Sequence, residues 1–390
     1  MRSVGAVLQD FRWVRPRFEL DQAASLNWLG QSHSQAEHLK RSSQSMDPDL
    51  LIRLFERYGC RPTYISKRGF ELPDLFESDL KKMETLSPKA TLNDCSEVTR
   101  GPSGVGISAR ARFFEQVATD RIRELFKCDT RAPQHLIHVT CTGYVSPSPV
   151  QVLIQERQWN QETRVTHAYH MGCYASHPTI RMAEGFCAAG LKKVDLVHTE
   201  ICSLHVDLAD HSPEQMVVQS LFADGHIRYS VANRDWAQPG GLDLISIHEE
   251  ILPNSLEAMT WRTSEWGMKM TLSRDVPRRI AVSIRQFLNR MIDEAIGNAA
   301  NPLGEFIFAI HPGGPKIIDQ LQDELNLRDD QVFHSKKVLQ NFGNMSSATL
   351  PHVWAAILAD PQVPAGRWII SLAFGPGLTA FGSVLRKRSE

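Results

Sequence analysis

The sequence predicts an α/β protein in which buried strands alternate with helices. Short apolar runs end in turn residues, amphipathic patterns follow them, and this alternation occurs in both halves of the chain. Both halves also contain a buried strand, a turn with a reactive type of residue, and then a helix. We therefore expect layered strands and helices in two similar halves, residues 1–239 and 240–390, although no repeat is visible in the letters.

The first half begins with a strand, "SVGAVLQDFRWV", and an amphipathic helix that starts near Asp21, a residue type that caps helices. Helices are expected at "DPDLLIRLFERYG" and "FESDLKKMETL", and a long helix follows the glycine-rich "GPSGVG". The apolar runs "HLIHVTCTGY" and "VDLVHTEICSLHVDL" are typical of buried strands, and a helix over residues 181–191 lies between them.

In the second half, "HIRYSVAN" and "DLISIHEEIL" are expected to be antiparallel strands. "DVPRRIAVSIRQFLNRMIDEAI" is a helix with a proline near its start. "EFIFAIHPGGPKIIDQLQDEL" predicts a buried strand, a tight turn and a helix, and "SKKVLQNFGNMSSATLPHVWAAIL" a loop that enters a helix. The strands of "RWIISLAFGPGLTAFGSVLR" are separated by a Gly-Pro-Gly turn.

The composition excludes several classes of protein. Hydrophobic residues make up 42% and charged residues 22% of the 390-residue chain, as in soluble globular proteins. The net charge of −1 gives no indication of a nucleic-acid or membrane surface. We expect neither a membrane span nor a signal peptide, because no apolar run is long enough.

The seven cysteines are scattered, and none forms a CxxC pair. This pattern argues against a disulfide framework and a zinc site, and it suits a reducing cytoplasm. The cysteines are Cys60, Cys95, Cys128, Cys141, Cys173, Cys187 and Cys202.

Cys173 differs from the other cysteines in its context. A lone cysteine is most often a small buried residue, and Cys187 and Cys202 are expected to be core. Cys173 follows Gly172, which allows close approach of the backbone, and precedes a helix. A helix N-terminus stabilises a thiolate, so the sequence predicts a nucleophile with a depressed pKa.

His311 and Asn344 are candidate partners for this cysteine. His311 in "FAIHPGGP" stands at the end of a buried strand, where α/β folds place functional groups, although a lone histidine is more often structural. Asn344 in "NFGNMSSAT" opens a helix after a glycine, and a simple N-cap is a strong alternative. Each signal is weak by itself.

Together these segments resemble the type III polyketide synthases, the chalcone synthase-like branch of the thiolase superfamily. The resemblance runs from about His138 to Leu385, and more loosely over the N-terminal part. It rests on the order and spacing of "GCYASHPTIRMAEG", "HTEICS", "LFADG", "RDVP", "HPGGPKIID", "GNMSSAT" and "FGPGLT". It implies a homodimer with a layered αβαβα thiolase-like fold and a buried site between the halves, reached by a tunnel.

The resemblance also implies a reaction. An acyl thioester would acylate Cys173, a malonyl-type thioester would lose CO₂, and the enolate would attack the acyl group in a Claisen condensation. His311 would act as an imidazolium partner of the thiolate, and His311 Nε2 with the Asn344 amide would stabilise the enolate oxygen. Backbone N–H groups near Cys173 and the Gly375–Pro376–Gly377 turn would form a second oxyanion hole. No metal or other cofactor is expected.

Further matches concern the substrate cavity. Phe222 matches a phenylalanine beside the nucleophile, Met270 stands in place of a second, gatekeeping phenylalanine, and Ser346 matches a position that influences cyclisation. The resemblance places Glu200, Cys202 and His205 on the strand that lines the cavity, where the bulk of His205 would shorten it. Tyr144 departs from the family near the subunit contact.

The largest departure lies where the family binds the phosphates of coenzyme A. Phe55, Tyr58 and Pro62 replace basic residues there, and Arg53, Arg57, Arg61 and Lys67 are near enough to substitute. We therefore hypothesise that the acyl donor arrives on an acyl carrier protein, whose acidic helix would meet this basic stretch.

Three alternatives to a polyketide synthase are kept. The enzyme could perform one condensation, or join two acyl chains from carrier proteins. It could be a Cys–His acyl hydrolase or transferase that makes no carbon–carbon bond, with His311 as general base. A non-catalytic scaffold is disfavoured, because all three polar groups are retained.

Overall fold

The computed structural model describes residues 5–39, 47–87, 100–297 and 303–389, and within them nine strands form one mixed sheet. The strand order across the sheet is β13-β14-β15-β10-β1-β9-β8-β6-β7. The strands are β1 (Ala6–Val14), β6 (His135–Thr140), β7 (Arg164–Tyr169), β8 (Lys193–Glu200), β9 (Gly225–Asn233), β10 (Leu242–Ile251), β13 (Ile307–Ile310), β14 (Trp368–Gly375) and β15 (Thr379–Lys387).

The pairing of these strands is the same in the two halves. In the first half, β6 pairs parallel with β8, β8 antiparallel with β9, and β9 antiparallel with β1. In the second half, β13 pairs parallel with β14, β14 antiparallel with β15, and β15 antiparallel with β10. The strand sequence β1, β6, β8, β9 is thus repeated as β10, β13, β14, β15. The boundary expected at residues 239 and 240 lies between β9 and β10.

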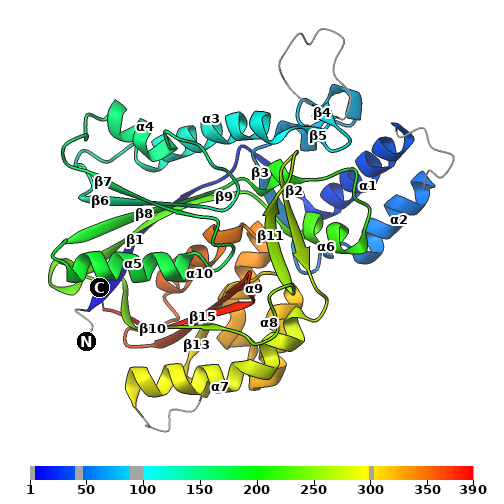
Figure 1. Cartoon of the computed structure of the whole chain (residues 1–390). Helices are drawn as coiled ribbons and strands as arrows, with labels where there is room; N and C mark the ends of the chain where they lie inside the picture. Colours follow the sequence, from blue (N-terminus) through cyan, green and yellow to red (C-terminus); the bar gives the residue numbers. More distant parts are fainter. Residues whose placement is uncertain (1–4, 40–46, 88–99, 298–302, 390) are drawn as a thin grey trace.

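The helices complete a five-layered arrangement, which Figure 1 shows from one side. Helices α3 (Ile107–Leu125) and α4 (Pro149–Glu156) cover the strands of the first half. Helices α5 (Ser176–Ala188) and α10 (Thr349–Ala359) lie between the two sets of strands and contact both, and α7 (Val276–Ile296) covers β10 and β15. The layered αβαβα fold predicted from the sequence is therefore confirmed.

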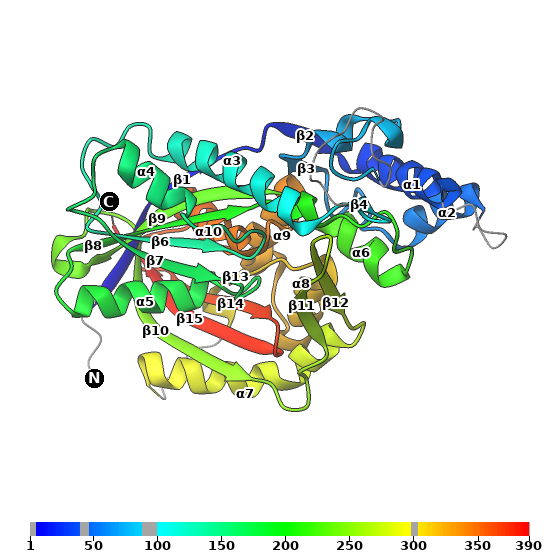
Figure 2. The ribbon, with the colours of Figure 1, turned by 45° about the horizontal axis from the view of Figure 1, so that its top comes forward.

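A smaller group of elements lies at one end of the sheet, on the right of Figure 2. It contains the helices α1 (Gln22–Leu39), α2 (Pro48–Tyr58) and α6 (Pro213–Leu221) and three two-stranded sheets. These sheets pair β2 (Phe18–Asp21) with β3 (Lys67–Phe70), β4 (Arg100–Gly101) with β5 (Gly104–Val105), and β11 (Met259–Thr263) with β12 (Met268–Leu272).

Two expectations about local structure are wrong. The segment "FESDLKKMETL" forms no regular helix, because its turns are the 3₁₀ helices η1 (Pro73–Phe76) and η2 (Leu80–Lys82). The residues "SKKVLQNF" lie within α9 (Asp329–Phe342), where Val338 and Leu339 are buried, and not in a loop. The expectation that "HIRYSVAN" and "DLISIHEEIL" are antiparallel strands is confirmed, since β9 and β10 each pair antiparallel with β1, which lies between them.

The remaining short elements follow strands or precede helices near the candidate site described below. Helix α8 (Pro315–Leu325) follows β13 after a short turn, and η6 (Ser346–Ala348) leads into α10. The 3₁₀ helix η3 (Cys202–His205) follows β8. In the described part of the chain, no helix has the length and apolarity that crossing a bilayer requires.

Candidate active site

A cavity of about 50 Å³ lies beside the end of β8, and residues from both halves line it. By this measure a single water needs roughly 10–15 Å³, so the cavity admits only a small group. The predicted site residues in its wall are Cys173, Cys202, His205, Phe222, Met270, Ser346 and Pro376. Cys95, singled out only as a cysteine, lies outside the described residues.

Cys173 is buried just before α5, and its thiol donates to Ser346 Oγ at 3.9 Å. Gly172 is required beside it: its φ is +86°, and a Cβ there would lie 2.6 Å from Pro376 Cδ. Burial raises the pKa of the Cys173 thiol to about 12, although its interactions with Ser346 and Asn344 act to lower it. The depressed pKa predicted from the sequence is wrong, because desolvation outweighs the helix N-terminus.

This high pKa predicts the pH dependence of alkylation. Thiolate is the reactive form, so the rate at which iodoacetamide alkylates Cys173 should rise about tenfold per pH unit from pH 7 to pH 10. Peptide mapping by mass spectrometry measures this rate at each pH. A plateau below pH 8 would contradict the prediction and would indicate a thiolate stabilised by an imidazolium.

The Asn344 side chain has a defined orientation. Its Oδ1 accepts from the backbone N–H of Ser346 at 2.9 Å, so its Nδ2 is left to donate, and it does so to Gly313 O at 3.2 Å. The Asn344 side chain also interacts with the Cys173 thiol, and this interaction acts to lower the thiol pKa. The side chain thus stabilises the local turn and, in addition, directs an N–H donor between Cys173 and the loop after β13.

His311 ends β13, with 2% of its surface exposed. Neither ring nitrogen has a hydrogen-bond partner among the described residues, which is unusual for a buried polar group. A Cβ on Gly313 would lie 3.6 Å from His311 Nε2, so this nitrogen borders the residue that Asn344 contacts. Burial lowers the pKa of His311 to about 3, so the ring is neutral and the predicted imidazolium is wrong.

Helix α6 and strand β12 form a wall of the cavity. Val218 and Phe222 face the cavity, whereas Val217 and Leu221 line a second cleft on the other side of α6. Phe222 is held at the site because Asn344 pairs with it as a parallel β-bridge. Met270 faces the cavity from β12.

Two of the predicted cavity residues do not line it. Glu200 is fully buried behind the wall, where its carboxylate accepts from Cys141 N and from the hydroxyls of Thr142 and Ser347. It therefore supports the wall from behind. Tyr144 contacts His170 Nδ1 through its hydroxyl and is not among the residues that line the cavity.

The Gly-Pro-Gly turn is only partly at the cavity. Pro376 lines it, while Gly375 and Gly377 do not. Gly375 is packed so closely that a Cβ would lie 2.3 Å from Tyr174 Cδ1, and Gly377 has a φ of +122°. Both glycines thus have a conformational role in placing Pro376 against Gly172.

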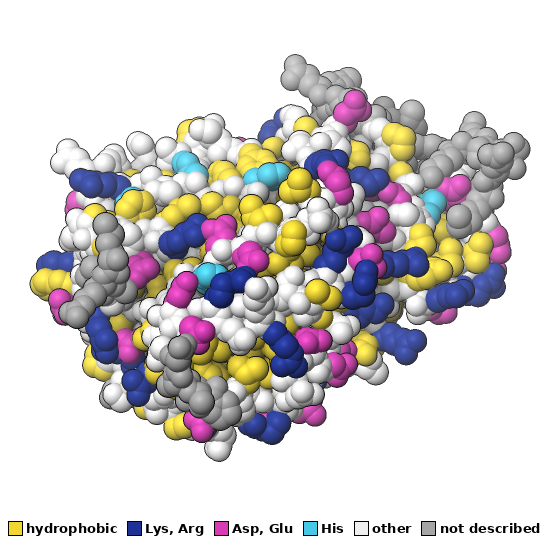
Figure 3. Space-filling view, turned by 60° about the horizontal axis from the view of Figure 1, so that its bottom comes forward, with side chains coloured by type: hydrophobic (Ala, Val, Ile, Leu, Met, Phe, Trp, Pro, Cys, Tyr) yellow, Lys and Arg dark blue, Asp and Glu magenta, His cyan; other side chains and the backbone are white. Residues whose placement is uncertain are grey.

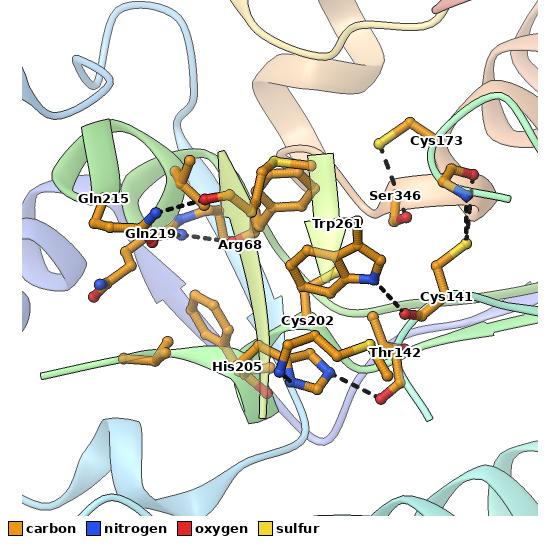
Figure 4. A pocket seen from close by; sticks show the side chains of 18 of the residues that line it. Arg68, Cys141, Thr142, Cys173, Cys202, His205, Gln215, Gln219, Trp261 and Ser346 are labelled. Atoms are coloured by element: carbon orange, nitrogen blue, oxygen red, sulfur yellow. Dashed lines mark hydrogen bonds between the residues drawn. The ribbon is translucent and has the colours of Figure 1, made fainter. Parts of the chain in front are cut away.

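Trp261, which the sequence reasoning missed, narrows the cavity together with His205 (Figure 4). Its Nε1 donates to Cys141 O at 2.7 Å, and its ring lies edge-on to His205 with centroids 5.3 Å apart. His205 is held on both sides, since Nε2 donates to Thr142 O and Nδ1 accepts from Met268 N. No local signal in "EAMTWRTSEW" indicates that Trp261 reaches the cavity.

Replacing Trp261 by alanine should therefore lengthen the product of a chain-extending reaction. We expect at least one additional malonyl unit, because the indole occupies space into which the growing chain could extend. Mass spectrometry of products measures this. Trp266→Ala is the control, because Trp266 lies in the same hairpin, stacks on Arg110 and does not line the cavity. An unchanged product length in Trp261→Ala would contradict the prediction.

The second cleft, of about 840 Å³, lies across α6 and is rimmed by basic residues. Of the four cations predicted to contact the donor phosphates, Arg57 and Arg61 line it. Arg53 instead lies 3.6 Å from Asp47 and Lys67 lies 3.0 Å from Glu19, so neither belongs to the cleft. Arg274 and Lys316, which the sequence reasoning missed, complete the rim.

Figure 3 shows lysine and arginine side chains gathered toward the right of one face, the side on which α1 and α2 lie. Gly313 and Gly314, in the turn after His311, also line the cleft. The cleft therefore reaches from the surface to the loop that contacts Asn344. Among the described residues, no group of three or more His, Cys, Asp or Glu side chains is arranged to hold a metal.

Comparisons with known proteins agree with this architecture. The profile of the chalcone and stilbene synthases, C-terminal domain, matches residues 243–388. Over 258 residues the chain is 26% identical to type III polyketide synthase C of Arabidopsis thaliana. The matched segment makes up 65% of this chain and 67% of that protein. The chain is a homologue of the type III polyketide synthases.

A longer relative is probable polyketide synthase 1 of Dictyostelium discoideum, with 29% identity over 256 residues. The matched segment covers 65% of this chain but spans only 8% of that protein's length. The resemblance to the type III polyketide synthases that the sequence motifs indicated is confirmed.

Solved structures of this family share the fold. The C-terminal type III polyketide synthase domain of Steely1, a type I/III hybrid from Dictyostelium, has a TM-score of 0.78 at 24% identity, covering 98% of this chain and 99% of that one. The 1,3,6,8-tetrahydroxynaphthalene synthase of Streptomyces coelicolor has a TM-score of 0.76 at 21% identity, covering 98% and 100%.

Proposed function

We propose that the protein is a type III polyketide synthase-like condensing enzyme that joins acyl and malonyl-type units through Cys173. The observation that carries the proposal is the orientation of Asn344. Its amide oxygen is occupied by Ser346 N–H, and its N–H₂ group lies between Cys173 and the His311–Gly313 loop. A fixed neutral donor beside a buried thiol suits a thioester oxygen that gains negative charge.

The first step is acyl transfer. Cys173 Sγ loses its proton and attacks the donor thioester carbonyl, so that a new carbon–sulfur bond forms and the donor thiol leaves with the proton. Because the free thiol has a pKa of about 12, the thiolate is scarce until the donor binds. The cavity then holds the acyl group away from water.

The second step is decarboxylation of a malonyl-type thioester. Carbon dioxide leaves, and the electron pair of the broken bond passes into an enolate whose oxygen accepts from Asn344 Nδ2 and His311 Nε2–H. A neutral imidazole suits this role: the pKa of the protonated ring is lowered to about 3, so the ring is neutral at pH 7, and the weakly acidic N–H of a neutral imidazole donates without transferring its proton. The enolate carbon attacks the acyl carbonyl, the carbon–carbon bond forms, and the Cys173 thiolate is released.

Incubation with malonyl thioester labelled with ¹³C at the free carboxyl tests this function. We expect labelled CO₂ in proportion to a product lengthened by two carbons. Hydrolysis of the acyl donor with no CO₂ release would overturn the proposal in favour of the hydrolase alternative, which the comparisons do not favour.

The basic cleft is proposed to bind the phosphates of a coenzyme A donor. Replacing Arg57 and Arg61 together by alanine should raise KM for an acyl-coenzyme A about tenfold and leave kcat unchanged, because these cations lie at the rim. The KM for the acyl-N-acetylcysteamine thioester, which lacks phosphates, should not change. Lys67→Ala is the matched control, because Lys67 pairs with Glu19 outside the cleft.

A carrier-protein donor is the other source of the same thioester. Loading rates with matched coenzyme A and carrier-bound acyl groups distinguish the two, and equal or faster loading from coenzyme A rejects the carrier. We also propose a homodimer and a cytoplasmic location. The six cysteines of the described residues are free thiols, which suits a reducing compartment.

A further inference from the structure

Arg68 is a buried guanidinium in the wall of the Cys173 cavity. It lies in β3 with 1% of its surface exposed. Its Nε donates to Gln22 Oε1 at 2.8 Å, and its Nη1 donates to the backbone oxygens of Gln219 at 2.8 Å and Phe222 at 2.6 Å. Its Nη2 donates to Ser25 Oγ. All four acceptors are neutral.

No carboxylate of the described residues lies within 4.0 Å of this guanidinium, unlike that of Arg121, which lies 2.7 Å from Glu71. Asp224 acts on Arg68 from farther away, but its own oxygens accept from Ser203 and from Glu71 N. Burial lowers the pKa of Arg68 to about 10, so it stays charged at neutral pH, and raises the pKa of Asp224 to about 7. A buried cation of this kind favours an anion.

Arg68 borders the cavity, so an anion could reach its guanidinium from the cavity side. Apolar side chains of Leu29, Phe70, Leu75 and Val206 also line the cavity. Figure 4 shows Arg68 beside Gln215 and Gln219, on the opposite side of Trp261 from Cys173. Nη2 carries two hydrogens and makes one hydrogen bond, so one charged donor remains.

We propose that this inner part of the cavity binds the carboxylate of a short dicarboxylic acyl group whose other end is the thioester carried by Cys173. A charge-assisted hydrogen bond to Arg68 would hold the free carboxylate, and the apolar walls would exclude water from it. The small cavity restricts the acyl group to a few carbons. This inference rests on the proposed acylation of Cys173, and it assigns Arg68 a role in choosing the acyl group.

This inference is tested in the wild-type protein with pairs of thioesters whose acyl groups differ only in charge. Succinyl and glutaryl N-acetylcysteamine thioesters are compared with their neutral ω-amides, and acylation of Cys173 is followed by intact-protein mass spectrometry. We expect at least one acid to load about tenfold faster than its amide. Equal or slower loading of both acids overturns the inference but leaves the proposed function, provided that acetyl or amide thioesters acylate Cys173. No acylation by any thioester overturns the proposed function itself.

Variants then test whether Arg68 causes the preference for the acid over its amide. Arg68→Met should abolish the acid-to-amide ratio, and Arg68→Lys, which retains the charge, should retain part of it. Arg110→Met is the control, because Arg110 is another 1% exposed arginine bonded to backbone carbonyls, but it does not line the cavity. Acid and amide are compared in the same protein sample, so a loss of stability alone does not change the acid-to-amide ratio. A ratio retained in Arg68→Met, or lost equally in Arg110→Met, overturns the inference.

Discussion

Replacing Cys173 by alanine is expected to lower product formation by more than about 10³-fold and to eliminate the covalent acyl-enzyme. The thiol is the proposed nucleophile, it is buried in the cavity wall, and it interacts with Ser346 and Asn344. Intact-protein mass spectrometry after incubation with an acyl thioester measures the adduct, and chromatography measures the product.

Two other cysteines serve as controls. Cys187 lies on α5, the helix that follows Cys173. It is 2% exposed and donates to Val231 O outside the cavity, so Cys187→Ala should cost about 1 kcal/mol of stability and leave the adduct intact. Cys202→Ala tests whether a neighbouring thiol of the cavity accepts the acyl group. An adduct that persists in Cys173→Ala would refute the assignment of the nucleophile.

Replacing Asn344 by aspartate should lower the rate of decarboxylative condensation by about 10²–10³-fold while Cys173 is still acylated. Aspartate retains the oxygen that accepts from Ser346 N–H, so the turn before η6 is preserved. It removes the Nδ2 donor and adds a negative charge where the enolate oxygen gains one. The substitution therefore separates the structural role of Asn344 from its proposed role as a donor.

Single-turnover measurements distinguish the two steps. The acyl-enzyme is formed first and isolated, and CO₂ release from malonyl thioester is then followed. Asn341→Asp introduces the same charge on α9 outside the cavity and should leave both rates unchanged. Equal losses of acylation and CO₂ release in Asn344→Asp would mean that the side chain only stabilises the fold.

Much of the architecture was predictable from local pattern, because buried strands and amphipathic helices have different periods. The predicted strands at "HLIHVT", "HIRYSVAN", "DLISIHEEIL" and "TAFGSVLR" lie where their apolar runs predict, whereas β7, β11 and β12 were not predicted. The failures occurred where tertiary contacts outweigh propensity. The segment "FESDLKKMETL" has the composition of a helix, but Asp74 accepts backbone N–H groups of residues 84–86 and holds the chain in short turns.

In the candidate site, too, local features were predictable and long-range contacts were not. Cys173, His311 and Asn344 each follow a strand or open a turn, which is a local feature, and their segments carry the family resemblance. The positions of Trp261 and Glu200, in contrast, depend on contacts with residues that are distant in the sequence. Trp261 reaches the cavity by a bond to Cys141, 120 residues away in the sequence, and Glu200 is withdrawn from it by bonds to Thr142 and Ser347.

The sequence by itself determined the layered fold and the resemblance to the type III polyketide synthases, and it named Cys173, His311 and Asn344 as candidates, since these inferences depend on periodicity and on the order of short motifs. Only the tertiary structure decided the protonation of Cys173 and His311, the width of the cavity and the presence of Arg68 in its wall. These properties depend on how much water is removed from each group and on which distant side chains surround it, and neither is encoded in the neighbouring residues.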